Sequence, residues 1–367
     1  MKIGFKNIMV LLALILGGSS CDSFLDVQPK GEVLEGDLLK DAKGFENALY
    51  GVYAKMGSTN LYGQNLSYSA LDLMAQYYTS TNNEEVEPLI KYDYTNTKAE
   101  DLFYNIWCDM YSNIAYANNV LEHLEKFSPA DMQFYNIYKG EALGLRAFMH
   151  FDLLRIFSEQ ITVNESADGI PYSTRFSLFA PDILKSKDVY KRIISDLRSA
   201  EQLLDDEELY ASASSNANFL KDQNIHFNLQ AVQATLARVY LTEGTLDSAL
   251  YYAQQVIQAP GLSLLDYTDI AGDLAGKLSS KETVFGIYSK NFAEPVIKIL
   301  HNSQTAYSFE MRYNIQQLYQ INGAGNDYRW GAWYTYNNTI KYWKLDKLTD
   351  TYVLNNTEYN RPAGEIR

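Results

Sequence analysis

Residues 227–261 read FNLQAVQATLARVYLTEGTLDSALYYAQQVIQAPG, and this stretch predicts two helices joined by a tight turn. Small side chains recur at Ala231, Ala234 and Ala237, so a second helix can approach this face closely. Gly244 supplies the turn, because glycine adopts backbone conformations that other residues avoid. A helix–turn–helix with small residues at the contact is the unit of tetratricopeptide arrays. The stretch therefore predicts a helical-repeat scaffold.

The sequence on both sides of this pair also has mostly helical periodicity. Apolar stripes and capping residues predict helices from Asp41 to Met56, Tyr68 to Tyr78, Trp107 to Leu121, Ser128 to Phe157 and Val189 to Leu204. No strict repeat of about 34 residues is visible, so any repeats are degenerate. Beyond residue 280, ETVFGIYS predicts a short strand, and the sequence after it is aromatic, polar and irregular. We therefore predict a mainly α fold: a tetratricopeptide-like α–α superhelical scaffold with irregular loops and a few short strands.

The first 21 residues have the layout of a bacterial lipoprotein leader. Two lysines precede an apolar run from Ile8 to Leu16, which is too short to span a bilayer, since a helix needs about 20 residues for that. Small residues lead to Cys21, as in the lipobox motif, although Gly18 stands where that motif prefers leucine. We predict a lipoprotein signal peptide at residues 1–20 and acylation of Cys21, with palmitate for example. The alternative is a plain secreted protein in which Cys21 keeps a free thiol.

The totals of the sequence narrow the classes of partner. The formal net charge is −14, which repels phosphate backbones and excludes nucleic acid as a sensible partner. Tyrosine is in excess, with 30 residues against 16 phenylalanines and 4 tryptophans. Its apolar ring and polar hydroxyl suit surfaces that are partly exposed to solvent. The simpler interpretation of any single tyrosine is a place in the helical core. A neutral ligand or a protein partner fits these totals.

Few residues offer catalytic or metal-binding chemistry. The four histidines lie far apart and no H-E-x-x-H or G-x-S-x-G motif occurs, so we expect no enzyme activity, no catalytic residue, no metal and no cofactor. His150 lies in an apolar helical stretch and is expected to be a packed or interface imidazole. Cys108, next to Trp107 in a helical pattern, is expected to be a buried and inert thiol.

Two segments combine aromatic rings with amide and carboxylate groups, which is the general composition of a ligand site. A sugar ring packs its C–H face on an aromatic plane, while its hydroxyls bond to polar neighbours. The segments are residues 77–94 and Gly325–Tyr336 (GNDYRWGAWYTY), both in predicted loops. The candidate ligand-binding residues are Tyr77, Tyr78, Asn82, Tyr92, Trp330, Trp333 and Tyr334. The alternative is that these aromatic side chains seal the helical scaffold.

Several motifs, in order along the chain, resemble the SusD/RagB family of nutrient-binding outer-membrane lipoproteins. CDSFLDVQPKG after the leader looks like the mature start of that family, and ATLARVYLTEG resembles its alanine-rich repeat pair. The residues that match its helical motifs are Trp107, Tyr111, Ile114, Asn118 and Leu121 for W-x3-Y-x2-I-x3-N-x2-L, and Glu141, Leu145, Arg146 and Ala147 for E-x3-L-R-A. Asp327, Arg329 and Lys341–Tyr342 look like its D-x-R and K-Y signatures. The agreement covers nearly the whole chain.

The chain departs from the family pattern at two places. Ser158–Gln160 stands where the family usually has Gly-Pro, and the chain stops at Ile366–Arg367, where the family continues into another helix pair. The resemblance therefore implies one SusD-like helical-repeat domain at residues 21–367 with an incomplete last repeat. For Glu141 and Arg146, position on a helix favours structural pairing over catalysis.

The resemblance implies a function as well as a fold. It implies surface capture of a nutrient, usually an oligosaccharide and sometimes a peptide, by a protein that a lipid anchors in the outer membrane. It also implies delivery to a SusC-type TonB-dependent transporter, over which the lipoprotein sits as a lid. Three alternatives stay open: a helical-repeat adaptor lipoprotein that grips a protein or peptide, an α-helical glycosidase with a facing carboxylate pair, and a non-functional truncated copy.

Overall fold

The computed structural model describes residues 38–79, 83–205, 218–266, 268–269, 281–287, 292–301, 327–337 and 342–345, with short pieces at 289, 310–311, 319, 351–354, 357–360 and 365–366. The predicted signal peptide at 1–20, Cys21 and Asn82 lie outside the described residues. Among the helices of the described part, none is long and apolar enough to cross a membrane.

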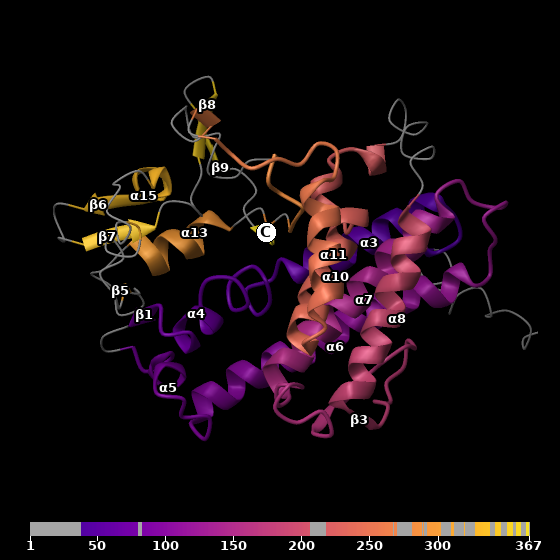
Figure 1. The fold of residues 1–367 in the computed structure, drawn as a ribbon, viewed down its shortest axis with the longest axis horizontal. Helices are drawn as coiled ribbons and strands as arrows, with labels where there is room; N and C mark the ends of the chain where they lie inside the picture. Colours follow the sequence, from indigo (N-terminus) through magenta and orange to yellow (C-terminus); the bar gives the residue numbers. More distant parts are fainter. Residues whose placement is uncertain are drawn as a thin grey trace, which may run out of the picture.

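Long helices form the body of the molecule, on the right in Figure 1. They are α3 (Ala42–Met56), α6 (Thr97–Leu124), α7 (Tyr135–Phe157), α8 (Ser186–Leu204), α10 (Leu229–Glu243) and α11 (Leu246–Ile257). Helices that follow one another pack together: α6 on α7, α7 on α8, α8 on α10, and α10 on α11. Gly244 joins the last pair with a left-handed φ of 94°. The mainly α fold that the sequence predicts is confirmed.

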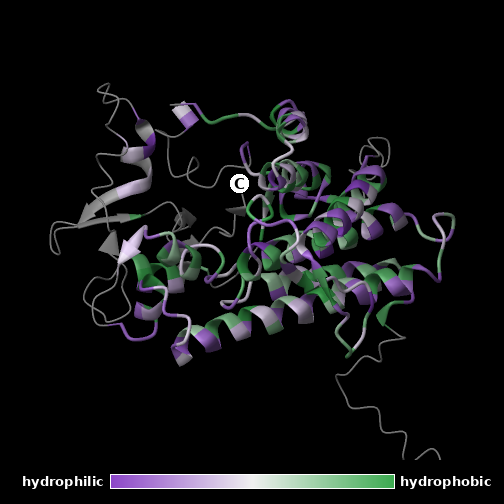
Figure 2. Ribbon diagram, turned by 60° about the horizontal axis from the view of Figure 1, so that its bottom comes forward, coloured by the Kyte–Doolittle hydropathy of each residue, from purple (hydrophilic) through white to green (hydrophobic). Residues whose placement is uncertain are grey.

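The helix α7 is the centre of this body, and every residue from Gly140 to Leu154 is buried. A helix that is covered on all sides lies inside the core rather than on its surface. Two glycines let neighbours approach closely: a Cβ at Gly140 would lie 2.6 Å from Leu204 Cγ, and one at Gly144 would lie 2.5 Å from Phe227 Cδ1. Figure 2 shows the apolar residues gathered where these helices face one another.

Gly144→Ala is expected to lower the free energy of unfolding by about 1–3 kcal/mol, because the added methyl would overlap the Phe227 ring in a close-packed core. Gly51→Ala is the matched control, since nothing lies within 4 Å of its added Cβ on α3. That control is expected to gain about 0.5–1 kcal/mol, because alanine favours a helix interior more than glycine does. Urea denaturation measures both changes, and a stable Gly144→Ala variant would contradict the packing described.

A second, smaller apolar region lies beside the helical body, on the left in Figure 1. Its elements are α4 (Ala70–Met74), β1 (Tyr78–Thr79), α5 (Glu87–Ile90), α13 (Ala293–Val296), the π-helical turn η3 (Ile297–His301), β5 (Glu310–Met311), α15 (Tyr328–Trp333), β6 (Tyr334–Asn337) and β7 (Tyr342–Leu345). Its buried centre includes Tyr68, Leu73, Leu89, Phe292 and Val296. The first turn of α6 also packs here through Ala99, so α6 contributes to both apolar clusters.

The described strands form two-stranded antiparallel pairs. The pairs are β1–β5, β2 (Asp168–Pro171) with β3 (Ile183–Lys185), β4 (Phe285–Gly286) with β10 (Glu365–Ile366), β6–β7, and β8 (Thr351–Leu354) with β9 (Thr357–Asn360). The strand predicted at ETVFGIYS shortens to β4. The sequence after it, which was predicted to be irregular, contains α15 and two hairpins. Strand formation depends on cross-strand partners, which a single segment does not reveal.

Two predicted helices are shorter in the structure than the sequence predicts. The helix predicted over Tyr68–Tyr78 ends at Met74, because Gln76 adopts a left-handed φ of 62° before the chain enters β1. The helix predicted to begin at Ser128 begins at Tyr135 instead. Half of the expected capping box forms there: the Ser128 backbone N–H donates to Asp131 Oδ2 at 2.8 Å, but the Ser128 hydroxyl donates to the same carboxylate instead of accepting a backbone N–H. Both hydrogen bonds close a turn that precedes the helix.

Candidate functional site

The motif residues Glu141 and Arg146 are paired inside the core. Glu141 accepts a 2.5 Å hydrogen bond from the Tyr53 hydroxyl and lies 3.2 Å from His226 Nδ1. Arg146 donates two hydrogen bonds to Asp196, at 2.7 and 2.8 Å. Both side chains therefore connect helices of the scaffold, which is the structural pairing that the sequence predicts. In the described part of the chain, no three potential metal ligands come together.

The two candidate binding segments meet in the smaller apolar region. Tyr78 lies on β1 and pairs with Met311 of β5. Burial raises the pKa of Tyr334 on β6, and the neighbouring Tyr319 and Tyr78 raise it further. Tyr78 and Leu345 of β7 pack in the same apolar cluster, and β7 pairs with β6, which carries Tyr334, so the fold brings together segments that are distant in sequence.

The rings of Tyr319, Trp330, Trp333 and Tyr334 form what we call the aromatic cluster. Trp330 stacks on Tyr334 with centroids 5.1 Å apart and an interplanar angle of 24°. Tyr319 lies 5.6 Å from Tyr334 and 5.9 Å from Trp330. The Arg329 guanidinium lies 5.4 Å from the Tyr319 ring and 5.9 Å from the Trp333 ring. The cluster thus has a cationic group over two of its rings.

Asp327 fixes the position of this guanidinium. Its carboxylate caps α15 by accepting the Arg329 backbone N–H, and it also accepts hydrogen bonds from the guanidinium at 2.9 and 2.5 Å. The hydrogen bond from Arg329 lowers the pKa of Asp327, so this carboxylate is ionised at neutral pH. Aromatic faces beside oriented donors and acceptors are what a small polar ligand with apolar faces requires.

The candidate residues differ in their exposure. Tyr78 and Tyr334 are only 7% and 9% exposed, so they pack inside the region rather than on its surface. Trp330 and Trp333 are half-buried and keep part of their surface in contact with solvent. The segment Gly325–Tyr336 was predicted to be a loop, but its described residues form α15 and β6, because the Asp327 cap starts a helix.

The remaining candidates lie outside the aromatic cluster. Tyr77 and Tyr92 are exposed, and neither forms a ring contact within the described residues. Tyr92 adopts a left-handed φ of 55° and its hydroxyl donates to the Met74 carbonyl at 2.8 Å, which ties α5 to α4. Asn82 lies outside the described residues, so the structure does not place it.

Sequence reasoning did not assign several residues of this region. Arg329 was known only as part of a family signature, and Tyr319 carried no local signal because its partners belong to α15 and β6.

Cys108 was predicted to be buried but is exposed. It follows Trp107 on α6, and one residue turns the side chain by about 100° around a helix. The thiol therefore points away from the apolar stripe that the periodicity identified.

The structure is a helical-repeat scaffold that carries a half-exposed aromatic cluster. In a comparison with known families, the model of the SusD-like family, described as starch-binding and associating with the outer membrane, matches residues 23–241. The chain belongs to the SusD-like family. The printed description gives starch binding and association with the outer membrane as properties of the family.

Two curated relatives come from Formosa agariphila. The chain is 28% identical to SusD-like protein P38 over 54% of its own length and 38% of the relative, and 26% identical to SusD-like protein P2 over 69% of its own length and 46% of the relative. It therefore spans less than half the length of these relatives.

Solved structures share the fold. A putative sugar binding protein from Bacteroides vulgatus superposes with a TM-score of 0.66 at 20% identity, covering 84% of this chain and 67% of that one. A SusD superfamily protein from Bacteroides thetaiotaomicron gives a TM-score of 0.67 at 21% identity, covering 84% and 70%.

Proposed function

We propose that this protein captures an oligosaccharide at the cell surface and passes it to a SusC-type TonB-dependent transporter without breaking the sugar chain. An acyl group on Cys21, exposed after removal of residues 1–20, would hold the protein at the outer membrane. Membership of a family described as starch-binding and associating with the outer membrane supports the ligand class and the location.

The observation that carries the proposal is the aromatic cluster. Trp330 and Trp333 offer partly exposed ring faces, and the Asp327–Arg329 pair beside them offers oriented donors and acceptors. A pyranose ring has apolar C–H faces and a hydroxyl rim, so it can use both kinds of group at once. Tyr334 stacks on Trp330 and is itself buried, and Tyr78 is also buried.

Trp330→Ala is expected to weaken oligosaccharide binding about thirtyfold, because truncating a tryptophan that anchors a ligand costs about 2 kcal/mol. Isothermal titration of the purified protein against neutral oligosaccharides measures this change. Tyr251→Ala removes an exposed ring from α11, away from the cluster, and is expected to leave affinity unchanged. Equal affinities of the two variants would show that the aromatic cluster is not part of the binding site.

The same samples test whether the protein cleaves the oligosaccharide. The oligosaccharide recovered after incubation is expected to keep its length, whereas new reducing ends would favour the glycosidase alternative. Co-purification of the protein with a barrel-forming transporter from outer membranes tests the proposed delivery step.

An adaptor function is the second candidate, and one observation favours it. One face of α11 carries three apolar side chains that are exposed to solvent. They are Leu246, Leu250 and Ile257, at spacings of four and seven residues. Such a stripe can accept an amphipathic helix of a protein partner. A pull-down in which Leu250→Asp abolishes capture of a protein, together with no binding to a glycan array, would favour this candidate over sugar capture.

A further inference from the structure

A cavity of about 550 Å³ lies between α6 and residues 171–181. This volume falls in the range of about 300–1,000 Å³ that is usual for ligand sites. None of its lining residues belongs to the aromatic cluster, and none of them carries a charged side chain. The cavity is therefore a separate, uncharged site in a chain whose formal net charge is −14.

One wall of this cavity is a face of α6. Trp107, Tyr111 and Ala115 follow one another at four-residue spacing, so they line the helix along its axis. The Trp107 ring is fixed from two sides, with its centroid 4.8 Å from that of Tyr111 and 4.9 Å from that of Phe157. Ser112 adds a hydroxyl to the same wall. The wall thus offers aromatic surface in a fixed position.

The facing wall is formed by the segment that follows β2. Ser173 and Ser177 contribute hydroxyls, and Phe176 adds a partly exposed ring. Leu178 is 102% exposed and Phe179 is 87% exposed. Phe176, Leu178 and Phe179 are neighbours in sequence, and a contiguous exposed apolar patch is typical of a binding surface.

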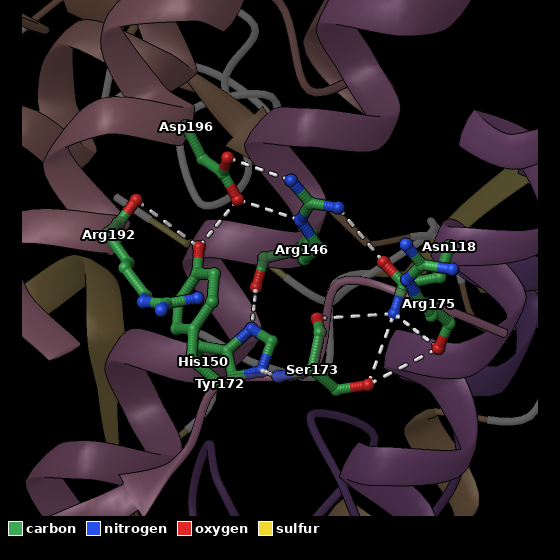
Figure 3. A network of polar contacts seen from close by, with 8 residues as sticks. All are labelled: Asn118, Arg146, His150, Tyr172, Ser173, Arg175, Arg192 and Asp196. Carbon is green, nitrogen blue, oxygen red and sulfur yellow. Dashed lines mark hydrogen bonds and ion pairs between the residues drawn. The ribbon is translucent and has the colours of Figure 1, made fainter. Parts of the chain in front are cut away.

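A buried polar network holds this facing wall in place, as Figure 3 shows. The Tyr111 hydroxyl donates to the Pro171 carbonyl at 2.7 Å, and the Ser173 backbone N–H donates to His150 Nε2 at 3.0 Å. The Asn118 amide donates to the carbonyls of Ser173 and Arg175, at 3.2 and 3.1 Å. The backbone from 171 to 175 is therefore fixed by side chains of α6 and α7.

The same network continues into the core. Arg146 donates to Asn118 Oδ1 at 3.1 Å and to Asp196, and the Tyr172 hydroxyl donates to Asp196 at 2.6 Å. Burial of polar groups costs free energy, but a network in which each buried group has a hydrogen-bond partner is rigid and holds one geometry. Here that rigidity is applied to the segment that lines the cavity, so the cavity is preformed rather than induced.

We propose that this cavity is a second saccharide site, which takes a neutral sugar. The uncharged lining offers a charged group of a ligand no partner, so it favours neutral sugars over charged ones. The rings of Trp107 and Phe176 supply planes for the C–H faces of a pyranose, and the hydroxyls of Ser112, Ser173 and Ser177 face its hydroxyl groups. Filling the cavity also covers part of the exposed apolar surface of Leu178 and Phe179.

Titration in the Trp330→Ala background isolates this second site from the aromatic cluster. The probes are maltoheptaose, cellohexaose and xylohexaose as neutral oligosaccharides, and an oligogalacturonate as the charged comparison. At least one neutral probe is expected to bind the Trp330→Ala protein with a stoichiometry of one, and the oligogalacturonate is expected not to bind. If no neutral probe binds this variant, or if the charged probe binds as tightly, the second site is refuted.

Filling the cavity gives the matched test. Ala115 is half-buried on the cavity wall, so Ala115→Trp blocks the space and is expected to abolish the remaining binding. Ala54→Trp adds the same ring at an exposed position of α3 and is expected to change nothing. Equal binding by these two variants would overturn the proposal.

A second variant keeps the test valid if the tryptophan disturbs folding. Phe179→Ser alters a side chain that is 87% exposed, so the fold loses little packing, and it is expected to weaken binding at least about fivefold. Unchanged affinity in this variant would count against the facing wall as part of the site. If Ala115→Trp loses binding while Trp330→Ala keeps full binding, the second site is supported and the aromatic cluster is refuted as a binding site. The experiment therefore distinguishes failure of one proposal from failure of the other.

Discussion

Asp196→Ala is expected to lower the free energy of unfolding by about 3–5 kcal/mol, because it leaves a buried guanidinium without its partner. The side chains of Arg146 and Asp196 are only 9% and 14% exposed, and two hydrogen bonds of 2.7 and 2.8 Å join them. The variant also removes the acceptor of the Tyr172 hydroxyl, so two buried donors lose a bond at once. Urea denaturation followed by circular dichroism measures the loss.

Asp188→Ala is the matched control for this change. Asp188 lies on the same helix and pairs with Lys191, but both side chains are substantially exposed. An exposed pair of this kind contributes little to stability, so the control is expected to change the free energy of unfolding only slightly. A similar small effect for Asp196→Ala would show that the network does not hold α7 to α8.

Acidification below pH 6.5 is expected to destabilise the fold through His150. Burial lowers the pKa of His150 from 6.5 to about 3, so the folded protein keeps this imidazole neutral over a range in which the unfolded chain protonates it. Its Nε2 accepts the Ser173 N–H and its Nδ1 donates to the Arg146 carbonyl at 2.8 Å, which leaves no place for a second proton. The stability due to this group is complete above pH 6.5 and is lost as the pH falls towards 3.

The slope of the free energy of unfolding against pH measures the contribution of His150. One proton taken up by the unfolded state alone costs about 1.4 kcal/mol of stability per pH unit. His150→Gln is expected to remove that part of the slope between pH 6 and pH 4, where other carboxyl groups contribute equally to both proteins. Parallel profiles for wild type and His150→Gln would contradict a neutral, buried imidazole.

The long helices could be predicted because each carries its own signal. The stripe in α6 and the pair around Gly244 lie within one continuous segment, where apolar spacing and a turn residue are sufficient. The short strands could not be predicted in the same way. β1 exists because it pairs with β5, and β4 because it pairs with β10, so the information lies in distant segments.

The binding region was predictable in composition but not in geometry. Trp330 and Trp333 stood out as tryptophans among polar residues, and the structure leaves both partly exposed. Their relation to Tyr319 and Arg329 depends on how α15 meets β6, which no local pattern contains. The cavity beside α6 was missed for the same reason, since its second wall comes from residues 171–181.

A crystal structure of the protein with a neutral oligosaccharide bound tests the central claim most directly. Our account predicts an intact sugar chain with at least one pyranose ring lying flat against Trp330 or Trp333 and a hydroxyl within hydrogen-bonding distance of Arg329 or Asp327. A cleaved sugar, or a saturated complex in which both indole rings remain free, would contradict it.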